Sequence, residues 1–167
     1  MAVTLLGAEV QASSVIRHGP REQPWVALTF DDGYSVERCA QIVRTLRAKG
    51  APATFFINGS VIERDPTRWR KLLRGFSVAN HTLSHKDLTR LDATSIRAQI
   101  ELNERVVERA LDRPMLRLLR PSYGAHDRQV VRIAAALGYH TVLWDTDGGD
   151  GRAGATTRSV IQAGSRG

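Results

Sequence analysis

The chain has 167 residues, a formal net charge of +7 and 42% hydrophobic residues, which is the composition of one ordinary globular domain. This composition excludes a disordered or fibrous protein, and the length falls short of the ~200–250 residues of a complete eight-stranded α/β barrel. No apolar run reaches the ~18 residues of a membrane span. The first 14 residues lack the basic start of a signal peptide, so we expect neither a membrane span nor a signal peptide in this chain.

The positive charge comes from 21 arginines and three lysines that are scattered along the chain. A nucleic-acid-binding protein more often gathers its basic residues into a cluster with interleaved aromatic residues. We therefore expect no nucleic-acid partner and interpret the arginines as a solvated surface. A polyanionic partner at a cell surface is equally compatible with the charge, and the sequence leaves the oligomeric state open.

Short apolar strands alternate with helical patterns along the chain. The first predicted strand, at 25–30, is followed by a helix at 36–48 and a strand at 53–57. A short helix behind Asp65, a strand at 76–79 and a long amphipathic helix capped by Asp92 come next. A strand at 115–119, a helix at 127–137, a strand at 140–144 and a weak final helix complete the series. This order predicts an α/β fold with a mainly parallel sheet.

Polar side chains follow each predicted strand. In a parallel α/β sheet the carboxyl ends of the strands lie at one edge, where the strand-to-helix loops converge and ligands bind. The groups best suited to catalysis are therefore predicted to share one face. They are Asp31, Asp32, Asn58, His81, His85, Arg120, Tyr123, Asp145, Asp147 and Asp150.

These residue types suit metal-assisted hydrolysis. Asp31 and Asp32 are adjacent, and neighbouring residues of an extended segment point to opposite sides, so the two carboxylates can take different roles. His81 and His85 are four residues apart, a spacing that lets both reach one cation on a helix or a helical turn. One aspartate with both histidines forms an open three-ligand set for a divalent metal, with zinc favoured. The other aspartate would be the general base, held by Arg120.

Aromatic side chains near these loops offer flat faces on which a sugar ring can stack. Tyr34, Tyr123 and Trp144 are the candidates, and we favour Tyr34 for substrate binding.

Three ordered motifs resemble one known family. TFDDG at 29–33, NHTLSH at 80–85 and RPSYG at 120–124 resemble the polysaccharide deacetylases, carbohydrate esterase family four, also called the NodB homology domain. The resemblance implies a distorted (β/α) barrel, incomplete at this length, that hydrolyses N-acetyl or sometimes O-acetyl groups on chitin, chitooligosaccharides, peptidoglycan or xylan. It places a lead-in at 1–24, the deacetylase domain at 25–167 and the protein outside the cell or in the cell envelope.

The resemblance also assigns roles by position. It makes Asp31 the catalytic base, Arg120 the arginine that orients this base and the backbone N–H of Tyr123 the donor to the oxyanion. It aligns Asp147 with an acid of the family's fourth motif. It makes a divalent ion the cofactor, with zinc first and cobalt or nickel as alternatives. The implied metal ligands are Asp32, His81 and His85.

The chain also departs from the family pattern. Gly151 stands where a tryptophan of the substrate groove is expected, and Tyr34 replaces a usual proline. The family's late Leu-x-His motif, which supplies a general acid, does not occur after His140. We therefore expect a C-terminally truncated domain that binds metal but is impaired in catalysis, because a general acid contributes ~10²–10⁴-fold. The alternatives are a catalytically dead carbohydrate- or metal-binding module and an amidohydrolase acting on a small C–N substrate.

Overall fold

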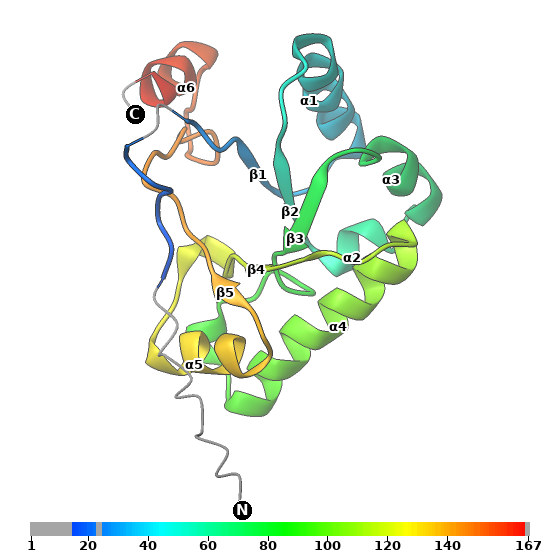
Figure 1. The fold of residues 1–167 in the computed structure, drawn as a ribbon, viewed down its shortest axis with the longest axis vertical. Coiled ribbons are helices and arrows are strands. Elements are labelled where there is room, and N and C mark those ends of the chain that lie inside the picture. Colours follow the sequence, from blue (N-terminus) through cyan, green and yellow to red (C-terminus); the bar gives the residue numbers. More distant parts are fainter. Residues whose placement is uncertain (1–14, 23–24, 166–167) are drawn as a thin grey trace, which may run out of the picture.

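A computed structural model describes residues 15–22 and 25–165, so most of the predicted lead-in at 1–24 lies outside the described residues. Within them, five strands form one parallel sheet whose spatial order follows the chain. The sheet is not closed, since β1 and β5 lie at opposite ends of this order (Figure 1). The strands are β1 (Thr29–Asp32), β2 (Thr54–Ile57), β3 (Ser77–Asn80), β4 (Leu116–Leu119) and β5 (His140–Thr141).

The predicted α/β fold with a parallel, incomplete barrel-like sheet is thus confirmed. Outside β5, the main chain of Ile16 pairs in parallel with Val142, and its N–H donates to the carbonyl of Thr141 at 2.9 Å.

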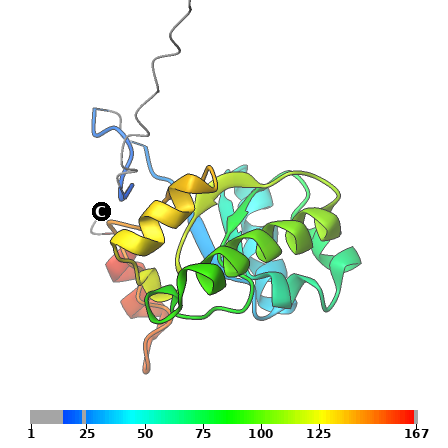
Figure 2. The same ribbon diagram turned by 90° about the horizontal axis from the view of Figure 1, so that it is seen from below.

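Helices α1 to α5 form an arc around the outside of the curved sheet, and α4 and α5 run side by side along its lower part (Figures 1 and 2). Aspartates cap the helix starts where the sequence predicts them, since Asp65 accepts from the N–H of Arg68 and Asp92 from that of Ser95. In the described part of the chain, no helix is long and apolar enough to cross a membrane. The helices are α1 (Val36–Lys49), α2 (Gly59–Ile62), α3 (Pro66–Leu72), α4 (Ala93–Leu111), α5 (Arg128–Ala136) and α6 (Thr157–Gly164), with 3₁₀ turns at Leu88–Arg90 and Ser122–Gly124.

The alternation of side chains along the strands separates the hydrophobic core from the functional face. Phe55 and Ile57 of β2 point toward the helices and join a buried cluster with residues of α1, α3 and α4. Phe56, between them, points to the inner face of the sheet, where the guanidinium of Arg120 lies 4.0 Å from its ring centroid. One face of the sheet therefore packs against the helices, and the other face holds polar side chains such as Arg120.

Two strand predictions have the wrong bounds. The strand expected at 25–30 begins only at Thr29, where its register with Thr54 of β2 begins. Trp25 and Val26 are consequently 77% and 82% exposed. The strand expected at 140–144 is reduced to His140–Thr141, which pair with Leu118 and Leu119 at the end of β4. The short helix α2 and the two 3₁₀ turns were not predicted.

Candidate metal and catalytic site at the carboxyl ends of the strands

Asp32, His81 and His85 converge at the carboxyl edge of the sheet. Asp32 is the last residue of β1, and His81 directly follows β3. Oδ1 of Asp32 lies 3.1 Å from Nε2 of His81 and 3.0 Å from Nε2 of His85. One ligand atom from each of the three residues lies within 4.8 Å of the others. The structure thus brings together the three residues that the sequence analysis grouped as metal ligands.

The loop that carries the two histidines is not helical. Thr82 and His85 have φ angles of 72° and 55°, in the left-handed region, and residues 81–85 form no helical turn, with a bend at 83–84. The prediction that His81 and His85 meet a cation on a helix or helical turn is therefore wrong in its backbone, although the four-residue spacing does bring the rings to 5.1 Å between centroids. Left-handed residues reverse the loop so that both rings face Asp32.

A register shift between β3 and β4 fixes the orientation of His81. Ala79 is paired with Leu116, but the next residue, Asn80, is paired with Leu119. This shift sets Arg120 beside His81, whose Nδ1 donates to the carbonyl of Arg120 at 2.7 Å. Because a carbonyl oxygen only accepts, Nδ1 carries the proton, and the lone pair of Nε2 is free for a cation.

The three side chains fit a divalent metal ion. Ligand atoms at zinc bond lengths of ~2.0–2.2 Å in tetrahedral geometry lie roughly 3.3 Å apart, close to the separations seen here. Oδ1 of Asp32 is buried and accepts no hydrogen bond of good geometry, as expected of an oxygen that serves as a metal ligand. Burial by itself raises the pKa of the Asp32 carboxyl, but contact with His81 and His85 outweighs burial and lowers that pKa well below its usual range.

Asp31 faces a different partner. Its Oδ1 accepts a hydrogen bond from Nη1 of Arg120 at 2.6 Å, and the same nitrogen donates to Oγ1 of Thr29 at 2.9 Å. Nη2 of Arg120 donates to the carbonyl of Leu143 at 3.1 Å. The Arg120 side chain is 3% exposed, and its guanidinium lies 4.0 Å from the ring centroid of Phe56 and 5.5 Å from that of Trp144. The two neighbouring aspartates are thus held by separate partners, one by an arginine and one by two histidines.

Two exposed tyrosines flank His85. The ring centroid of Tyr123 lies 4.5 Å from that of His85, and the centroid of Tyr34 lies 5.9 Å away on an edge-on approach. Tyr34 is 62% exposed and Tyr123 is 69% exposed. Partial desolvation and the charge of Asp32 raise the pKa of Tyr34 above its usual range. Tyr123 also has a left-handed φ of 62°. Both tyrosines are therefore largely exposed beside Asp32, His81 and His85.

Asp147 lies in the glycine-rich loop before α6. Its carboxylate accepts from the N–H of Gly149 at 2.8 Å and pairs with Nη2 of Arg152 at 2.7 Å. Both interactions lower the pKa of Asp147, the hydrogen bond from Gly149 most strongly. These partners belong to its own loop and to neither histidine, so the catalytic assignment of Asp147 stays a prediction.

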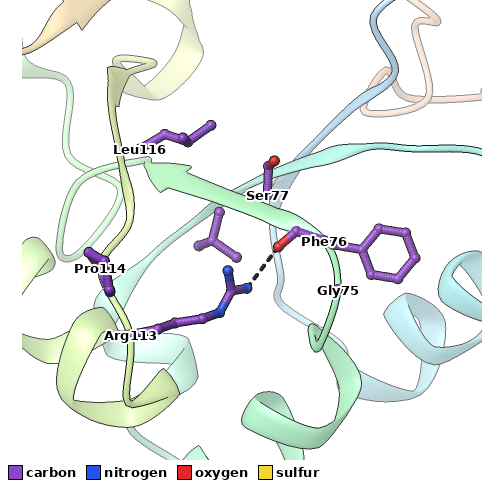
Figure 3. Close-up of a pocket in the computed structure, with 7 residues that line it drawn as sticks. Gly75, Phe76, Ser77, Arg113, Pro114 and Leu116 are labelled. Atoms are coloured by element: carbon purple, nitrogen blue, oxygen red, sulfur yellow. Dashed lines mark hydrogen bonds between the residues drawn. The ribbon is translucent and has the colours of Figure 1, made fainter.

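A cavity of about 290 Å³ lies at the opposite ends of the strands (Figure 3). Its walls come from the start of β3, around Phe76 and Ser77, and from the segment that leads into β4. Arg113 reaches into this region and donates to the carbonyl of Phe76 at 2.8 Å. Since ligands of such sheets bind at the carboxyl ends of the strands, this cavity is not the candidate site.

The sequence analysis missed several side chains that build the site. Thr29 accepts a hydrogen bond from Arg120, and the ring centroid of Phe56 lies 4.0 Å from the Arg120 guanidinium. Thr29 precedes Asp31 by two residues, so the period of two along a strand places both on one face and could have identified it. Trp144, offered as a sugar-stacking residue, is half-buried and closes on Gly124, where a Cβ would lie 2.9 Å from its ring.

Comparison with known proteins places this geometry in a family. The model of the family described as polysaccharide deacetylase matches residues 18–142. The chain belongs to the polysaccharide deacetylase family. The three motifs that resemble this family in the sequence all lie inside the matched range.

Named relatives of this deacetylase-family chain act on acetylated sugars. A chitooligosaccharide deacetylase from Bradyrhizobium sp. (strain ANU 289) is 31% identical over 123 residues, which is 73% of this chain and 56% of that protein. A peptidoglycan-N-acetylglucosamine deacetylase from Bacillus cereus is 31% identical over 126 residues, 75% of this chain and 58% of that protein. The chain therefore spans little more than half the length of these curated relatives.

A solved structure supports the same fold. The family 4 carbohydrate esterase from Streptomyces lividans, in complex with acetate, matches with a TM-score of 0.76 and 31% sequence identity. The match covers 85% of this chain and 73% of that chain.

Proposed function

We propose that this chain carries the metal-binding and base-bearing part of a hydrolase that removes N-acetyl groups, or O-acetyl groups, from a polysaccharide. The observation that carries the proposal is the pairing of the Asp32, His81 and His85 cluster with a neighbouring Asp31 that is held by Arg120. The relatives named as chitooligosaccharide and peptidoglycan deacetylases support chitooligosaccharides and peptidoglycan as the substrate class. For peptidoglycan, the site of action would be the cell envelope.

The donor set favours zinc, with cobalt or nickel as alternatives. Two imidazole nitrogens and one carboxylate oxygen suit a borderline ion, and three protein ligands leave a position open for water and substrate. Such an ion, when bound, lowers the pKa of its water and polarises the acetyl carbonyl.

Asp31 acts as the general base in this proposal. Its carboxylate takes a proton from the attacking water, whose oxygen adds to the acetyl carbonyl carbon. Arg120 fixes the carboxylate through a bond of 2.6 Å to Oδ1 and leaves the second oxygen for the water. Collapse then breaks the C–N bond, releases acetate and leaves an amine that takes up one proton.

The tyrosines beside His85 complete the proposed site. The backbone N–H of Tyr123 would donate to the developing oxyanion, a contribution of about 3–4 kcal/mol for one such donor. The exposed rings of Tyr34 and Tyr123 suit stacking against the apolar face of a sugar.

Acetate release from N-acetylglucosamine oligomers tests the proposal. The chain is stripped with a chelator, reloaded with Zn²⁺ or Co²⁺, and compared with Asp31→Asn and with Asp112→Asn. Asp112 matches Asp31 in chemistry but lies at the exposed end of α4. We expect metal-dependent release in the parent and in Asp112→Asn, and its loss in Asp31→Asn. Release that survives in Asp31→Asn would contradict the base assignment, and zinc binding without any release would favour a non-hydrolytic binding module.

A further inference from the structure

A set of buried polar side chains, hereafter the polar network, links helix α4 to the loop that carries His81 and His85. All of its members are polar, yet all are 0% exposed. Fully buried polar groups persist where they hold a particular conformation, because burying them without partners is costly. The polar network consists of Asn58, Asn80, Thr82, Asn103 and Ser122.

Asn103 is the member that comes from helix α4, and it lies near the middle of that helix. Its Nδ2 donates to Oδ1 of Asn80 at 2.8 Å and to the carbonyl of Ile57 at 3.1 Å. Asn80 in turn donates from Nδ2 to the carbonyl of Ile100 at 3.0 Å, so both ends of its amide are fixed on α4. Its Oδ1 also accepts from the N–H of Thr82 at 2.9 Å, which is the first bond to the loop.

Thr82 passes this constraint on to His85. Its Oγ1 accepts from the N–H of His85 at 3.2 Å and shares a hydrogen bond of 3.0 Å with Oγ of Ser122. A φ of 72° is unfavourable for a β-branched residue, so these bonds are needed to hold it. Nδ2 of Asn58 holds the loop from the other side by donating to the carbonyl of His81 at 2.6 Å. The loop conformation therefore depends on the polar network rather than on local preference.

The position of Asn103 is chemically unusual. It stands on the apolar stripe of α4, between Ile100 and Val107, where a hydrophobic side chain would pack without penalty. Its Oδ1 is buried without a hydrogen bond, a cost that the fold accepts. This oxygen lies close to Gly59, and a Cβ added at Gly59 would be only 2.8 Å from it. The two hydrogen bonds that Nδ2 donates offset this cost, and one of them goes to Asn80, which in turn bonds the loop that carries His81 and His85.

We propose that Asn103 is a positioning residue for the metal ligands. It fixes Asn80 and, through Asn80 and Thr82, sets the backbone that aims His81 and His85 at Asp32. The inference rests on the proposed metal site, and it assigns to α4, which contributes no ligand, a part of the metal affinity.

The test compares Asn103→Ala with Val107→Ala. Val107 is equally buried, lies one turn further along α4 and belongs to the hydrophobic cluster behind the sheet, so its loss lowers stability without touching the polar network. Zinc affinity is measured by competition with a chromophoric chelator at a temperature where both variants are folded. We expect affinity to fall up to about 10-fold in Asn103→Ala, the lower end for a partner that bonds a ligand directly, because Asn103 acts through Asn80 and Thr82. Affinity should stay at the parent value in Val107→Ala.

A second readout needs no metal. Amide exchange in the metal-free protein should be about 3–10-fold faster at Thr82 and His85 in Asn103→Ala, the factor that loss of one hydrogen bond gives, and unchanged there in Val107→Ala. Should the alanine variant not fold, Asn103→Ser retains a shorter donor and should give an intermediate loss in both measurements.

The outcomes separate this inference from the proposed function. Equal zinc affinity in Asn103→Ala and Val107→Ala would overturn the positioning role while leaving the metal site in place. A parent chain that binds no zinc would overturn the proposed metal site, and unchanged exchange at Thr82 and His85 would then overturn the inference as well.

Discussion

Arg120 holds Asp31 in place, and its replacement by methionine should show how much this ion pair contributes to stability. Methionine retains much of the side-chain volume beside Phe56 and Trp144 but removes every donor. The carboxylate of Asp31, the hydroxyl of Thr29 and the carbonyl of Leu143 each lose the donor that Arg120 supplies.

The expected cost follows from burial. Removing one partner of a buried ion pair costs about 3–5 kcal/mol. The Arg120 side chain is 3% exposed, but that of Asp31 is 30% exposed and can be partly hydrated, so we expect the lower end, about 3 kcal/mol. In a double-mutant cycle with Asp31→Asn, the coupling should be about 1.5–3 kcal/mol, the value of a hydrogen bond to a charged group.

Urea unfolding with a chelator present measures these free energies without a contribution from bound metal. Arg90→Met is the matched control, because the Arg90 side chain is 85% exposed and its loss should change stability little. Arg120→Lys should recover only part of the loss, since one ammonium cannot reproduce the planar fork. Additive effects of Arg120→Met and Asp31→Asn would refute the argument that this pair is held together by direct charge-assisted bonding.

Three further outcomes are expected. His81→Ala combined with His85→Ala should reduce zinc stoichiometry from about one per chain to none in a folded protein, and retained stoichiometry would show that both rings are structural. Burial and a hydrogen bond of 2.8 Å to Glu104 raise the pKa of Tyr139 to about 12 from 10.0 in the unfolded chain. The contribution of Tyr139 to the free energy of unfolding is thus fully present below pH 10 and is lost as pH rises through about 12. Tyr139→Phe should remove this pH-dependent loss when unfolding is measured at several pH values. Gly33→Ala should cost about 1–3 kcal/mol in urea unfolding, because φ is 83° and the new Cβ meets buried side chains at 3.1 and 3.2 Å; a cost near zero would contradict this.

Strand order alone predicted that the two aspartates, His81 and Arg120 share one edge of the sheet, because the carboxyl ends of parallel strands lie together there. Strand order did not show which aspartate faces the histidines and which faces Arg120. That assignment was implied only by the family resemblance. The catalytic roles themselves stay predictions.

The details that aim these residues depend on tertiary structure. The register shift that sets Arg120 beside His81 arises between two strands, so neither strand's own pattern reveals it. The left-handed φ of Thr82 contradicts the local preference of threonine and is held by distant side chains. In the sequence, Asn103 is recognisable only as a polar residue on the apolar stripe of a helix. That position indicates a role only once its hydrogen-bond partner, Asn80, is known.

The backbone at the site also bears on how this protein could be stabilised. Of five non-glycine residues with positive φ in the described part of the chain, four belong to the site, namely Asp32, Thr82, His85 and Tyr123. A left-handed conformation costs an L-residue roughly 1–2 kcal/mol, a cost that glycine avoids. A selection for heat resistance alone would therefore favour glycine at these four positions, which the proposed function assigns to ligation and substrate contact. If that function holds, stability and activity compete at these loops, so engineering for stability should be directed to the exposed helices and should leave these four positions unchanged.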